Sequence, residues 1–222
     1  MEDQTKEIAQ LLDDFRYIKN TVMKNNRVFK FVSSSTLRPV YLFTGLVIII
    51  FATVIQLLMQ HFGSYTNIPG MIKTVYYIGL AVCTIWLSYT KLKLLLKRMR
   101  ELGSDITIPE FFKEIYTWNT LVLMTPYMIV MGLVAVFLVS RGLSGYLVPF
   151  LAILYGLMIN SATSLLFLRE FMIGAVWFLL TGLTVLFTLG PSQPLLGLVI
   201  TFGLGFIVMY AASLVFATDK VG

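Results

Sequence analysis

The sequence predicts an all-α, polytopic membrane protein with six transmembrane helices and an N-terminal amphipathic helix. Only 13% of its 222 residues are charged while 58% are hydrophobic, and the mean hydropathy is +0.84. Soluble domains carry about 25% charged residues, so this composition excludes an ordinary globular protein. The apolar residues also form runs of about 20, which is the length that an α-helix needs to cross a bilayer.

The predicted elements follow from these runs and from the short connections between them. HFGSYTNIPG, SRGLSGY and GPSQP are rich in Gly, Pro and Ser and are typical of tight turns between helices. Residues 1–39 form a cytoplasmic N-terminal helix, residues 90–117 a long cytoplasmic connection, and residues 217–222 a cytoplasmic tail. The spans are predicted at residues 40–62, 71–89, 118–139, 147–168, 171–189 and 195–216.

The distribution of basic residues predicts the orientation of the chain. Of its 17 lysines and arginines, all but Lys73 and Arg141 lie on one side of the predicted membrane. All 11 acidic residues lie on that same side. Cytoplasmic loops carry the excess of basic residues, so we expect both termini in the cytoplasm and a location in a plasma or inner membrane.

Each predicted span contains a Gly-Leu pair, and FTGLVIIIF, VMGLVAVFL and LTGLTVLFT recur in alternate spans. This repetition is compatible with three helical hairpins and with two inverted halves of three spans. The triple-hairpin pattern resembles the six-span acid-resistance membrane proteins of the HdeD type. The long cytoplasmic segments of this chain depart from that pattern, so the resemblance implies no activity and no site residue.

Residues 5–32 carry an apolar stripe at alternating spacings of three and four, interrupted by Asn25. Such a heptad stripe is typical of a helix that packs along one face. It is compatible with packing on the membrane or bundle, with homo-oligomer formation, and with docking of a protein partner. The lipid bilayer, including anionic inner-leaflet lipids, is an expected partner in the first case.

A second basic segment extends the second span into the cytoplasm. Lys93, Lys97 and Arg100 lie on one helical face, opposite Leu92 and its apolar neighbours. This pattern predicts an interfacial helix that also fixes topology, with a binding patch for an anionic lipid or an acidic partner as the sharper hypothesis.

The sequence contains few residues of the types that carry out catalysis. The middle of each span lacks ionisable residues, which normally mark ion and proton pathways. There is no nucleophile–base–acid set, phosphate-binding loop or metal-ligand spacing, and the single cysteine, Cys83, cannot form an intrachain disulfide. Glu114, Glu170 and His61 are isolated in sequence. We therefore expect no enzyme activity, no cofactor, no metal and no nucleic-acid partner.

The polar residues inside the spans are small and neutral. In the segment YGLMINSATS, Gly156, Asn160 and Ser164 recur every four residues, and Gly197, Thr201 and Gly205 repeat this spacing in the sixth span. Small residues at this spacing let helices approach closely, and an Asn between them can form a hydrogen bond across the seam. The alternative is a polar lining for a neutral solute, with Pro126 bending the third span to open a cavity.

These observations predict a non-enzymatic accessory, scaffold or sensor-like membrane protein that acts through its cytoplasmic helices. The alternative is a small transporter or channel for a neutral or weakly polar solute.

Overall fold

A computed structural model describes residues 34–101, 118–166, 169–189 and 192–218 of the chain. Six of the helices in these ranges are long and apolar enough to cross a membrane, and the described residues form no strands. The predicted all-helical, six-span fold is therefore confirmed, and the protein is an integral, multi-pass membrane protein. The N-terminal helix expected within residues 5–32 lies outside the described residues.

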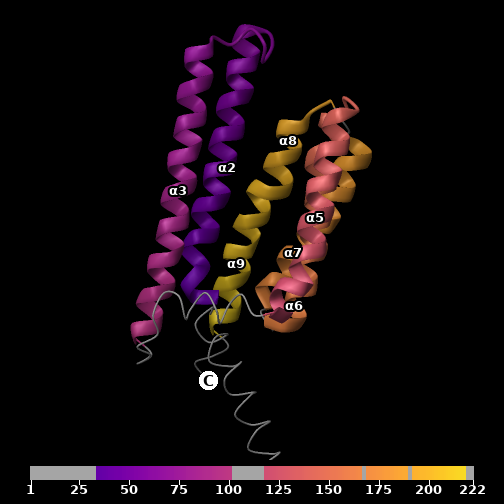
Figure 1. Ribbon diagram of the computed structural model, residues 1–222. Helices are drawn as coiled ribbons and strands as arrows, with labels where there is room; N and C mark the ends of the chain where they lie inside the picture. Colours follow the sequence, from indigo (N-terminus) through magenta and orange to yellow (C-terminus); the bar gives the residue numbers. More distant parts are fainter. Residues whose placement is uncertain (1–33, 102–117, 167–168, 190–191, 219–222) are drawn as a thin grey trace, which may run out of the picture.

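The helices run alternately up and down, joined by short turns at one end (Figure 1). Gly63 and Gly142, in two of the predicted turns, have φ angles of 78° and 70°, a left-handed conformation that favours glycine at the end of a helix. The spans are α2 (Ser34–Phe62), α3 (Gly70–Glu101), α5 (Trp118–Ser140), α6 (Leu147–Leu166), α7 (Arg169–Thr188) and a sixth made of α8 (Pro194–Leu198), η2 (Val199–Gly203) and α9 (Leu204–Thr218); η1 (Ser144–Tyr146) is a short 3₁₀ turn before α6.

We call the end of the bundle that carries Arg38, Lys93 and Lys97 the basic end. Here α2, α5 and α7 begin, whereas α3, α6 and α9 end. At this end α2 includes residues ahead of the predicted span at 40–62, and the stretch of α2 that could cross a membrane is Leu37–Phe62. Leu37, in the first turns of α2, is buried.

The closely packed part of the bundle consists of α2, α6, α7 and the sixth span. The pair α6 and α7 packs most extensively, and α9 lies between α2 and α7 (Figure 1). In the most apolar stretch of the sixth span 33% of the residues are buried, whereas in α3 and in α5 only 6% are. The two latter helices are therefore peripheral, and they present most of their apolar side chains to the surroundings.

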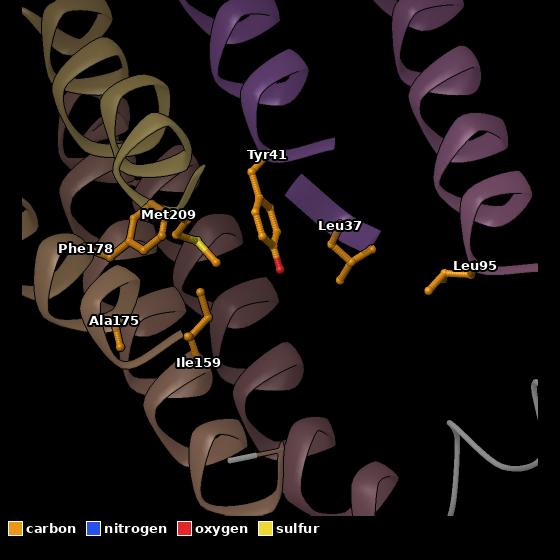
Figure 2. Packing of buried hydrophobic residues seen from close by; sticks show 7 residues of the cluster. All are labelled: Leu37, Tyr41, Leu95, Ile159, Ala175, Phe178 and Met209. Atoms are coloured by element: carbon orange, nitrogen blue, oxygen red, sulfur yellow. The ribbon is translucent and has the colours of Figure 1, made fainter. Parts of the chain in front are cut away.

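A buried cluster joins the packed helices near the basic end. Figure 2 shows Tyr41 of α2 extending between Leu37 and the side chains of α7 and α9. Leu95 of α3 belongs to the same cluster, so the otherwise peripheral α3 is held here. The members are Leu37, Tyr41, Leu95, Ile159, Ala175, Phe178 and Met209.

Candidate functional site

Gly156 and Asn160, four residues apart in α6, lie in two different environments. Gly156 is buried in the seam with α7, where an added Cβ would lie 2.9 Å from Leu179 Cγ and 3.0 Å from the carbonyl oxygen of Ala175. Gly182 makes a similarly close approach from α7 to Ile153. The helices α6 and α7 thus approach each other closely at these two glycines.

Asn160 lies outside this seam, because four residues advance a helix by slightly more than one turn, a rotation of about 40°. Its side chain is exposed, and within the described part of the chain no group forms a hydrogen bond with its amide. The next residue, Ser161, is hydrogen-bonded to the Tyr127 hydroxyl of α5 at 2.6 Å. The side chain of Ser164 lies outside the described residues.

The sixth span contains a feature that the sequence did not reveal, the π-helical turn η2. Thr201 lies inside it, fully buried, and its Oγ1 donates to the carbonyl oxygen of Gly197 at 2.7 Å. A π turn interrupts the i to i+4 ladder, and Trp177 of α7 donates its indole N–H to the Ile200 carbonyl oxygen at 3.2 Å. The polar groups of this turn are thus used in packing.

Aromatic rings and glycine contacts fill the space around the π turn. Phe178 is 0% exposed and packs edge-on against Tyr155 with ring centroids 5.0 Å apart. Phe202 and Phe206 from the sixth span complete this group of rings. An added Cβ on Gly205 would lie 2.8 Å from Phe178, so the sixth span approaches α7 through its small residues as well.

The hollows near the predicted polar residues are surface grooves. Pro126 lies in the exposed part of α5 and lines a groove of about 510 Å³ with apolar neighbours and Thr125. A second groove, of about 450 Å³, lies between α2 and α3 and is lined by Phe51, Tyr76 and other apolar residues. Neither groove brings Pro126 together with Asn160 or Thr201.

The basic face predicted after the second span is exposed where the structure describes it. Lys93 and Lys97 point outward, whereas Leu95 is buried and Leu92 packs against the same cluster. The side chain of Arg100 lies outside the described residues, although its backbone belongs to α3. At 1.5 Å per residue the 32-residue helix is about 48 Å long, so it extends well beyond a hydrocarbon core of about 30 Å.

A polar junction at the basic end was not predicted as a site. Arg38 of α2 donates from Nε to Ser213 Oγ at 3.3 Å and from Nη2 to the Ser213 carbonyl oxygen at 3.0 Å. Glu170, in the first turn of α7, is only 2% exposed at the same end. A helix N-terminus stabilises such a carboxylate. Apolar spacing could not find this junction, since its members come from three distant segments.

The hydrogen bonds of this junction are suited to holding α2 and α9 together. In the described ranges, no group of three or more His, Cys, Asp or Glu side chains is arranged to hold a metal ion.

A comparison of the chain with known protein families, curated proteins and solved structures found no match.

Proposed function

We propose that the protein is a non-enzymatic membrane accessory or scaffold that works by association, with its basic end facing the cytoplasm of a plasma or inner membrane. The observation that carries this proposal is the filled centre of the bundle. Phe178 and its ring neighbours occupy the space between α6, α7 and the sixth span. Thr201, which is fully buried in the π turn beside these rings, is bonded to its own helix.

The same observation weighs against the alternative of a small transporter for a neutral solute. Such a pathway would need polar groups that are accessible along a continuous cavity, whereas Ser161 and Tyr127 bond to each other. The exposed face of Lys93 and Lys97 supports association instead, because it presents positive charge where anionic headgroups or an acidic partner can reach it.

Reconstitution of the purified protein into liposomes tests this proposal. We expect osmotic swelling with small neutral solutes such as glycerol or urea to proceed at the rate of protein-free liposomes. Solute entry that exceeds this rate, and that changes in Pro126→Ala or Asn160→Ala, would establish the transporter alternative. Gly132→Ala is the control for α5, because an added Cβ there meets no atom within 4 Å.

Association is measured on the same preparation. We expect protein extracted in mild detergent to retain anionic lipid or an acidic partner. The triple variant Lys93→Gln, Lys97→Gln, Arg100→Gln is expected to lose this component. Retention that is unchanged in the variant would contradict a role for the basic face.

A further inference from the structure

Asn160 presents an amide at a depth where lipid offers no partner. It lies three residues before the end of the candidate span Ser144–Thr163 and sixteen after its start. At 1.5 Å per residue these separations are about 4.5 Å and about 24 Å, which places the amide about one turn inside the nearer edge of the hydrocarbon region. Its side chain is exposed on the surface of this chain.

The groups of the described chain that lie near this amide form no hydrogen bond with it. Gly156 is closed against Ala175 and Leu179, and Ser161 is hydrogen-bonded to Tyr127. A polar group in hydrocarbon without a hydrogen bond is strongly unfavourable. Side chains of a helix tilt toward its N-terminus, so that of Asn160 is directed toward the middle of the membrane and away from the nearer headgroups, and its partner must lie within the membrane.

We propose that Asn160 marks a face through which two copies of this chain associate, with the two Asn160 amides hydrogen-bonded to each other. An amide carries both a donor and an acceptor, so it is complementary to itself. Two copies with the same topology, related by a two-fold axis along the membrane normal, hold Asn160 at the same depth. The proposal deepens the associative function proposed above and rests on it.

The surroundings of Asn160 are suited to such a contact. Phe150 and Leu157 lie on the exposed side of α6, at 37% and 40% exposure, and can pack against the same residues of the second copy. They contribute no charge that would repel an identical surface. A second copy with the same topology also carries its Asn160 amide at the same depth in the membrane.

The test is the oligomeric state of the full chain in liposomes, measured by energy transfer between labelled copies as the protein is diluted with lipid. We expect a dimer whose dissociation constant rises about tenfold in Asn160→Leu, since membrane hydrogen bonds are individually modest. Asn160→Gln keeps the amide and should remain close to the parent. Thr84→Leu is the matched control, because Thr84 is an exposed polar residue on the distant α3 whose hydroxyl donates to the carbonyl oxygen of Leu80.

Two outcomes would overturn the inference. One is a parent protein that stays monomeric at every dilution. The other is a dimer that is equally stable in Asn160→Leu and in the parent, which would show that another face is used. Thermal unfolding of each variant provides the folding control, and we expect no loss of stability in Asn160→Leu because this side chain packs against no other helix.

A covalent test uses the same position. Cys83 is the single cysteine of the chain, so Asn160→Cys in a Cys83→Ala background carries one thiol. Oxidation should yield a covalent dimer at position 160, whereas Thr84→Cys in the same background should yield none. Failure of both dimer tests with no solute entry would remove this inference and leave the proposed associative function standing. Solute entry would remove the proposed function, whatever the oligomeric state.

Discussion

Gly45 of α2 lies directly against Gly203 of the sixth span. A Cβ added to Gly45 would come within 2.7 Å of the Gly203 carbonyl oxygen and 2.9 Å of Ile207 Cγ1. The Gly203 carbonyl oxygen belongs to the backbone, so it cannot move away by a change of rotamer. Two glycines from the two ends of the sequence thus set the distance between the first and last spans.

Replacing Gly45 with Ala should therefore lower the free energy of unfolding by about 1–3 kcal/mol, as expected for overpacking of a tight contact. Thermal unfolding in detergent measures the effect. Gly132→Ala is the matched control, because it makes the same change inside α5 where the added Cβ meets open space. Equal stability of the two variants would contradict the close contact between α2 and the sixth span.

The hydrogen bonds between Arg38 and Ser213 predict a charge-dependent contribution to stability at the basic end. Arg38→Ala should lower the free energy of unfolding by about 1–3 kcal/mol, because hydrogen bonds to charged groups are stronger than neutral ones. Ser213→Ala should have a smaller effect, since the carbonyl oxygen that accepts from Nη2 remains. If Ser213→Ala proves as harmful as Arg38→Ala, the backbone contact is not the stronger one.

The topology prediction concerns the accessibility of single cysteines in a Cys83→Ala background. Ser64→Cys and Ser144→Cys lie at the end opposite the basic end and should react with an impermeant reagent in intact cells. Ser104→Cys, outside the described residues, should react only after the membrane is opened. Labelling at Ser104 in intact cells would reverse the orientation inferred from the basic residues.

The exposed lysines of α3 predict salt-sensitive binding to anionic lipid. A peptide covering residues 91–101 should bind acidic vesicles about a hundredfold more weakly when Lys93, Lys97 and Arg100 are replaced by Gln, since each charge near the surface contributes about 1 kcal/mol. Added salt should reduce the difference by screening. Equal binding of the parent peptide to neutral and acidic vesicles would leave this segment a structural role only.

The number of spans could be predicted because hydrocarbon thickness sets the length of an apolar helix, and the six runs meet that requirement. The role of each glycine could not. All six spans contain a Gly-Leu pair, yet Gly156 and Gly182 make close contacts between helices while Gly132 faces open space. Hydropathy records the tendency to enter a membrane, whereas these contacts depend on which helices become neighbours.

For the candidate site as well, the sequence pattern did not reveal which residues meet in the folded chain. The periodicity of α6 places Gly156 and Asn160 on one face, whereas in the structure Gly156 lies in the seam with α7 and Asn160 is exposed, since four residues rotate a helix by about 40° beyond a full turn. The junction of Arg38 with Ser213 joins residues that are 175 positions apart. No local pattern contains such a pair, and the π turn around Thr201 likewise has no signature in the apolar run.

The packing of α2 against α9 also has a consequence for the order in which the helices can assemble. The ribosome completes Arg38 early and Ser213 late, 175 residues afterwards. At about 5–20 residues per second, this interval is roughly 9–35 s. Throughout it the first span must wait in the bilayer without its final neighbour, while α6 and α7 can already pair as consecutive helices. The contact between the first and sixth spans can therefore form only at the end of synthesis, when α9 has been made.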